Sequence, residues 1–117
     1  MSFDSDIKRF SDKVKVSIDK AVRTVAFDAF GMVVKKTPVD TGRARGNWNI
    51  SVGSIDYSVN ENATTKKSPD IKKGDGLKPI FITNSLEYIE DLENGTSQQA
   101  PNGMVAITVN EIRGRLS

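Results

Sequence analysis

A long stretch of helical periodicity near the start of the chain limits the possible folds more than any other feature. Apolar side chains recur there at spacings of three and four residues, which places them on one face of a helix at 4–36. The helix should end before Pro38, and at 1.5 Å per residue it would be roughly 45–50 Å long. Its apolar stripe consists of Phe3, Ile7, Phe10, Val14, Ile18, Ala21, Val25, Ala29 and Met32.

A helix of this length exceeds what the rest of one small domain can cover. The chain has 117 residues, which predicts a single domain spanning 1–117 with one core. Beyond Arg23 the stripe widens, because Phe27, Phe30 and Val34 add a second apolar edge. We therefore expect the C-terminal half of the helix to be buried, and we expect Trp48 to pack against it near Val25, Ala29 or Met32. The N-terminal half should project or meet a neighbour.

The sequence after Pro38 changes to the two-residue period of β-strands. Apolar and polar residues alternate from Trp48 to Val52 and again from Ile55 to Val59, which predicts a hairpin or bent strand at about 46–59. A mostly apolar segment predicts another strand at about 79–84. The polar residues between them, 60–78, predict a mobile loop that carries Lys66, Lys67, Lys72 and Lys73.

The last third of the chain predicts a short helix and one element of ambiguous type. Leu86, Ile89 and Leu92 share a face of a helix at 86–93. The segment 104–116 fits two structures: its β-branched residues favour a strand, and its three- and four-residue spacing favours a helix.

The composition removes most of the common catalytic chemistry. Cysteine and histidine are both absent, which excludes disulfides, thiol nucleophiles, histidine relays and the usual zinc sites. No apolar run approaches the ~20 residues of a membrane span, and no secretion signal is readable. We therefore expect no catalytic residues, no cofactor and no metal site.

The tripeptide Asp40-Thr41-Gly42 is shared with aspartic proteases, but its context differs from theirs. Those enzymes hold two such carboxylates between strands beneath a hairpin flap. Here the tripeptide follows a long helix, and the nearby Arg43 and Arg45 would keep Asp40 ionised. The residues instead predict a turn in which Asp40 accepts backbone N–H bonds and Gly42 adopts a positive φ. A dimeric protease is the weakest of three functional hypotheses.

Charge is distributed unevenly along the chain. Residues 1–36 carry eight Lys or Arg against five Asp, whereas 79–112 contains no basic residue. Such opposite patches suit head-to-tail contacts between subunits, although solvated faces would look the same. The candidate interface residues are Ile7, Phe10, Lys66, Lys67, Lys72, Lys73, Glu87, Glu90 and Asp91.

Two segments together carry a family resemblance. TPVDTGRARGNW at 37–48 and FITNSLEYIEDLENGTSQQAPNGMV at 81–105, after a long helix, resemble the head–tail joining (neck or tail-completion) proteins of long-tailed lambdoid-type bacteriophages and prophages. The chain departs from that pattern at 89–91, where Ile-Glu-Asp replaces a basic pair. Matching residues are Pro38, Asp40, Thr41, Gly42, Arg43, Trp48, Asn84, Tyr88, Leu92, Glu93, Gly95, Ala100, Pro101, Gly103 and Met104.

The resemblance implies an α+β fold in which a small, mostly antiparallel sheet packs on the long helix, and it implies a helix at 104–116. It further implies a hexameric or dodecameric ring in the virion, between the head connector and the tail tube or terminator. DNA would pass through this ring without specific binding, and the subunits would assemble in the host cytoplasm, with no membrane. The alternative is a small nucleic-acid-binding protein that uses the basic helix and the lysine-rich loop.

Overall fold

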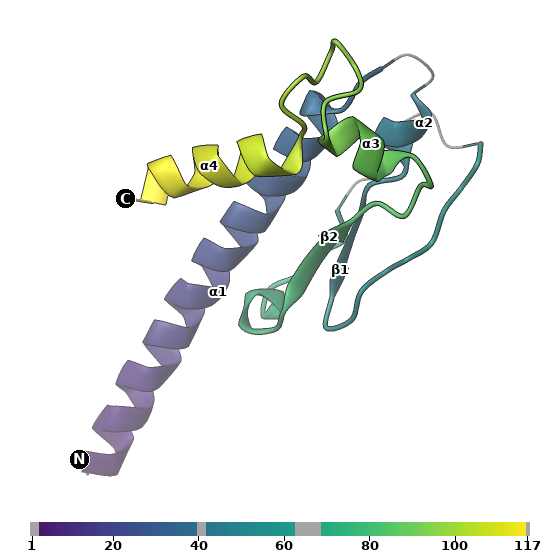
Figure 1. Cartoon of the computed structure of the whole chain (residues 1–117). Helices are drawn as coiled ribbons and strands as arrows, with labels where there is room; N and C mark the ends of the chain where they lie inside the picture. Colours follow the sequence, from purple (N-terminus) through teal and green to yellow (C-terminus); the bar gives the residue numbers. More distant parts are fainter. Residues whose placement is uncertain (1–2, 40–41, 63–68, 117) are drawn as a thin grey trace.

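The computed structural model describes residues 3–39, 42–62 and 69–116 and shows an α+β fold (Figure 1). A long N-terminal helix packs with a two-stranded sheet and a shorter C-terminal helix. The elements in order are α1 (Phe3–Lys36), α2 (Arg43–Gly46), β1 (Asn49–Val52), the 3₁₀ turn η1 (Asp75–Leu77), β2 (Ile80–Thr83), α3 (Ile89–Glu93) and α4 (Val105–Leu116). The expected fold class, including the C-terminal helix, is confirmed.

Helix α1 gives the molecule its elongated shape. The principal dimensions are 62 × 30 × 17 Å, and the N-terminal part of α1, before Asp19, extends away from all other elements (Figure 1). In that part Ile7 is 51% exposed and Phe10 is 70% exposed. In the C-terminal half the prediction of burial is confirmed for Phe30 and Val34, but it is wrong for Phe27, which is 39% exposed.

The core lies where the end of α1 meets β1 and the start of α4. Phe30, Val33 and Val34 form a buried cluster with Trp48 and Met104. Trp48 is 3% exposed, and its Nε1–H donates to Thr37 Oγ1 at 2.7 Å. Burial of Trp48 against the long helix was expected.

The neighbours expected for Trp48 were wrong. We expected Val25, Ala29 or Met32, which belong to the long apolar stripe, but none of them is in the core cluster. The helix has two apolar edges, and the second edge, containing Phe30 and Val34, is the one that packs on the sheet. The long apolar stripe does not take part in the core.

Strands β1 and β2 pair antiparallel, with Ile50 opposite Ile82, and both of these side chains pack against the core. The expected strand at 46–59 is too long, since only Asn49–Val52 is a strand. Residues 53–60 run back beside β1 without joining the sheet (Figure 1).

Side chains, not backbone pairing, hold the segment 53–60. The Asn49 amide donates to the carbonyl of Ser58 at 2.8 Å, and the Thr83 hydroxyl donates to that of Asp56 at 2.6 Å. Asn47 exchanges two bonds with the backbone of Asn60. These side chains donate to backbone carbonyls within 56–60, which are therefore not paired with the backbone of β1. For this reason the alternating pattern at 55–59 does not produce a strand.

Helix α4 lies against the C-terminal half of α1. Two ion pairs join them, Lys36 with Glu111 at 2.8 Å and Asp28 with Arg115 at 3.8 Å. The hydrogen bond from Lys36 lowers the pKa of Glu111 below its ordinary value and outweighs the opposing effect of burial. Both pairs are solvent-exposed, so each stabilises the contact only weakly.

Two element boundaries also differ from the expected ones. The short helix begins at Ile89 rather than at residue 86, because Asn84 Oδ1 accepts the N–H of Leu86 and a turn occupies 84–88. The expected loop 60–78 contains the turn η1. Residues 63–68 of that loop lie outside the described residues.

Candidate functional site

The projecting half of α1 is an exposed amphipathic surface. Ile7, Phe10, Val14 and Ile18 follow one another at spacings of three and four, and all four are exposed. Within the described part of the chain nothing covers this stripe. An apolar stripe of this length without a partner is typical of a surface that another molecule covers.

The basic residues of this half are distributed around the helix. Lys8 and Lys15 are exposed and, being seven residues apart, share one side of the helix, whereas the exposed Lys13 lies on another side. These lysines flank the apolar stripe and do not form one continuous basic face. Phosphate binding would need such a continuous face.

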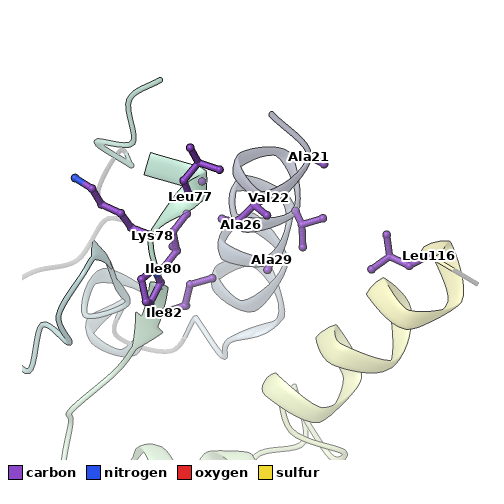
Figure 2. Close-up of a pocket in the computed structure, with 12 residues that line it drawn as sticks. Ala21, Val22, Ala26, Ala29, Leu77, Lys78, Ile80, Ile82 and Leu116 are labelled. Carbon is purple, nitrogen blue, oxygen red and sulfur yellow. The ribbon is translucent and has the colours of Figure 1, made fainter. Parts of the chain in front are cut away.

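A groove of about 630 Å³ lies beside α1 (Figure 2). Val22, Val25 and Ala29 of α1 form one wall, and η1 and β2 form the opposite wall through Leu77 and Ile80. Leu116 of α4 also contributes to the lining of this groove. Its lining is almost entirely aliphatic.

The groove continues the exposed stripe of α1. Ile18, Val22, Val25 and Ala29 follow at spacings of four, three and four, so they share one helix face. The nine-residue stripe in the sequence therefore runs from the projecting end into the groove, and the core is built on the other apolar edge.

A second, smaller pocket of about 330 Å³ lies between the sheet and α3. Its buried lining includes Trp48 and Met104, and its exposed lining includes Tyr57, Ser85 and Glu90. Glu90 and Asp91 are exposed, and neither has an ion pair within the described residues. The pocket is apolar inside and acidic at its edge.

The segment 74–78 is attached to α1 through Asp19. The Asp19 carboxylate is buried and accepts the N–H groups of Gly74 at 3.0 Å and Gly76 at 2.7 Å, while Arg23 pairs with it at 3.0 Å. A Cβ on Gly76 would lie 2.2 Å from the Asp19 carbonyl oxygen, so no larger residue fits there. The sequence Gly-Asp-Gly at 74–76 thus binds a carboxylate of its own chain.

The charge of Asp19 is stabilised by these contacts. Burial raises the pKa of Asp19, but the Gly74 N–H, the Arg23 side chain and the Gly76 N–H together lower it below the ordinary value of 3.8. The anchor therefore needs an ionised carboxylate.

The Glu93 carboxylate likewise accepts backbone N–H groups, here at the start of α4. Its Oε1 accepts the N–H groups of Met104 at 2.9 Å and Val105 at 2.8 Å, and its Oε2 accepts that of Ala106 at 3.1 Å. Burial raises the pKa of Glu93, but hydrogen bonds from the three N–H groups together have the larger, opposite effect. The pKa therefore lies below the ordinary value of 4.5. Glu93 is therefore a structural residue and not part of a solvated acidic face.

The predicted motif at 37–48 closes the end of α1. Arg45 donates to the carbonyls of Thr37 at 2.7 Å and Lys35 at 2.8 Å, where the helix leaves its last carbonyls without intrahelical partners. Pro38 is buried, and Gly42 has a φ of 73° at the start of α2. Asp40 and Thr41, and so the proposed Asp40 turn, lie outside the described residues.

Arg43 connects several elements around this motif. Its guanidinium pairs with Glu61, lies 3.4 Å from Glu87 and stacks 5.3 Å from the centre of the Tyr88 ring. The Glu87 side chain therefore makes an ion pair within the chain.

The remaining predicted residues lie in separate places. Gly95 and Gly103 line the loop between α3 and α4, where Gly95 approaches the carbonyl of Pro101. Lys72 and Lys73 are exposed beside η1, and Lys66 and Lys67 lie outside the described residues.

The profile of one protein family, described as "Bacteriophage HK97-gp10, putative tail-component", matches residues 2–95. The chain belongs to the HK97-gp10-like family. The match contains the whole motif at 37–48 and the helix α3, while α4 follows it. No curated protein and no solved structure matches the chain.

Membership in the HK97-gp10-like family makes the protein a structural component of the phage tail, and therefore of the virion. It also implies contacts with other virion proteins. Across residues 3–39, 42–62 and 69–116, no helix has the length and apolar character that crossing a membrane requires.

Proposed function

We propose that this tail component forms a ring at the head–tail junction, as a neck or tail-completion protein, and acts by oligomerisation and docking without turnover. The exposed, projecting half of α1 is the observation that carries the proposal. A helix with an uncovered apolar stripe needs a second molecule to cover it, and a virion structural protein has neighbours that can do so.

Different surfaces at the two ends of the subunit suit a ring. The N-terminal half of α1 lies at one end of the molecule, and α3 lies at the other (Figure 1). Residues of α3 and β2 line the apolar, acid-edged pocket. Contacts between two different surfaces are heterologous, and they close into rings when the rotation between subunits permits. The neighbours in the virion would be the head connector and the tail tube or terminator protein.

DNA would pass through such a ring without being gripped. The acids Glu90 and Asp91 repel phosphate, and no basic residue lies between 79 and 112 to bind it. Free subunits associate only weakly, because a small interface barely outweighs the entropy cost of association, and a neighbouring ring acts as a template.

Complementation tests this proposal. A phage that lacks its own copy of the gene is supplied with the wild-type chain or with Ile7→Asp/Phe10→Asp. The double variant should fold, since both side chains are exposed, and should leave filled heads and separate tails that fail to join.

Val16→Asp is the matched control for this double variant. Val16 is also an exposed apolar residue of α1, at 58%, but it lies off the stripe. It should yield infectious particles. Normal particles from Ile7→Asp/Phe10→Asp would contradict the assembly role of the stripe.

A further inference from the structure

We propose that the projecting half of α1 docks into the acid-edged pocket between the sheet and α3 of a second copy of this chain, with Phe10 as the anchor. This inference rests on the proposed function and names the receiving surface. The pocket, of about 330 Å³, is lined by Trp48, Ile82, Ile89 and Met104 inside and by Glu90 at the edge.

Size and polarity match at the anchor. Phe10 is 70% exposed, more than Ile7, Val14, Val16 or Ile18 of the projecting half. A cavity of about 150 Å³ lined by aliphatic side chains already holds a benzene ring, so the pocket has room for a phenyl group. Aromatic anchors in well-packed pockets contribute most of the binding energy in many interfaces.

Charge also matches on both sides. Residues 7–15 carry Lys8, Arg9, Lys13 and Lys15 against the single acid Asp12. The pocket edge carries Glu90, with Asp91 beside it, in a stretch from 79 to 112 that contains no basic residue. Lys13 lies three residues after Phe10 and is its neighbour on the helix surface, so insertion of Phe10 brings Lys13 towards Glu90.

The docking helix must come from another molecule. The N-terminal half of α1 extends away from the fold, at the end opposite to α3, so it cannot reach the pocket of its own chain (Figure 1). The larger groove beside α1 is a poorer receiver for a basic segment, because Lys78 is the one charged residue in its lining. Charge therefore favours the smaller pocket.

Engineered disulfides test the inference directly, because the chain has no native cysteine. Ser11→Cys is placed beside Phe10, and Ser85→Cys is placed at the pocket. When the two full-length variants are mixed under mild oxidation, a covalent dimer of the two chains should form. Ser11→Cys mixed with Leu77→Cys, which lines the larger groove, should give less than about a tenth of that yield.

Charge reversal distinguishes a specific contact from random collision. Lys13→Glu in the Ser11→Cys chain should lower the yield roughly threefold to tenfold, because an attraction becomes a repulsion. Glu90→Lys in the Ser85→Cys chain should restore it. Circular dichroism and thermal melting of each variant establish that the fold is retained.

Each result of this experiment is decisive for the receiving surface. A disulfide at Ser85→Cys that follows the charge reversal supports the inference. A disulfide at Leu77→Cys instead, no disulfide at either position, or a yield indifferent to charge reversal overturns it. Complementation by Ile7→Asp/Phe10→Asp is read separately, so loss of joining without the Ser85→Cys disulfide overturns this inference and leaves the proposed function standing.

Discussion

Glu93 and Val105 are joined by a hydrogen bond of 2.8 Å, from the Val105 N–H to the Glu93 carboxylate, which connects the last residue of α3 to the first residue of α4. The same carboxylate accepts two further N–H groups at the start of α4. A negative charge at a helix N-terminus also opposes the positive end of the helix dipole. Glu93 is therefore the side chain that positions the C-terminal helix.

Replacing Glu93 should destabilise the protein. Glu93→Ala removes the cap of α4, and loss of a helix cap typically costs about 1 kcal/mol. Urea unfolding followed by circular dichroism measures the change. Glu90→Ala, in the same helix but exposed, should change the free energy of unfolding by less than about 0.5 kcal/mol. Equal effects of the two would contradict the capping role.

Glu93 should also make stability depend on pH. Its pKa in the folded chain is below the ordinary value of 4.5, so its contribution is complete above the pKa of the unfolded chain. The contribution is lost as the pH falls through the lower folded-state pKa. In Glu93→Gln this part of the acid dependence should disappear, and an unchanged acid profile in urea titrations would show that the charge is not used.

Gly103 should tolerate no side chain. Its φ is +82°, and a Cβ there would lie 2.4 Å from the carbonyl oxygen of Glu93. Gly103→Ala should cost more than about 2 kcal/mol. Gly114→Ala is the control, because Gly114 lies within α4 with open space around it, and alanine should stabilise that helix by roughly 0.5–1 kcal/mol. Thermal melts that rank the two variants in the opposite order would refute this geometry.

Thr37 should matter for the burial of Trp48. The Thr37 hydroxyl donates to the carbonyl of Val33 at 2.6 Å and accepts from the indole of Trp48 at 2.7 Å. Thr37→Val keeps the shape but leaves the indole N–H unpaired, at a cost of about 1–3 kcal/mol. Trp48→Ala should cost roughly 3–5 kcal/mol.

Thr24→Val is the control for Thr37→Val. Thr24 also bonds back to the carbonyl four residues earlier, at 2.9 Å, but it is exposed. Its replacement should be nearly neutral in the same unfolding assay. Trp48 is the only tryptophan, so its emission should be blue-shifted in the folded chain, and a water-exposed emission maximum would contradict its burial.

Asp19 should control the opening of the segment 74–78. Asp19→Asn removes the charge that the Gly74 and Gly76 N–H groups and Arg23 stabilise. Amide hydrogen exchange at Gly74 and Gly76 should become faster, while exchange in the core of α1 should not change. Equal protection of these glycines in the wild type and the variant would show that Asp19 does not hold the segment.

Local patterns predicted much of this architecture. The length of α1 follows from the three- and four-residue spacing of its apolar side chains and from Pro38, which ends it. Both are local signals in the sequence. Local patterns do not predict which of the two apolar edges of α1 packs on the sheet. Both edges have helical spacing, and only the position of the sheet determines which one is covered. For the same reason the stripe predicted the projecting surface and gave the wrong neighbours for Trp48.

The contacts that sequence reasoning missed join residues that are far apart. Asp19 binds N–H groups fifty-five and fifty-seven residues later, and Glu93 binds those of a helix eleven residues later. Capping signals in sequence act over about three residues, so no local pattern marks these carboxylates. The alternation at 55–59 wrongly predicted a strand. This segment is held by side-chain hydrogen bonds, such as those from Asn49, and such bonds produce no periodic pattern in the sequence.

Location in the virion is the most direct test of the proposed ring. Purified particles would be labelled with gold-conjugated antibody against this chain and imaged by electron microscopy. The account predicts label at the head–tail junction of each particle, and loss of joined particles when the chain carries Ile7→Asp/Phe10→Asp. Label distributed along the tail tube, or particles that lack the chain altogether, would contradict it.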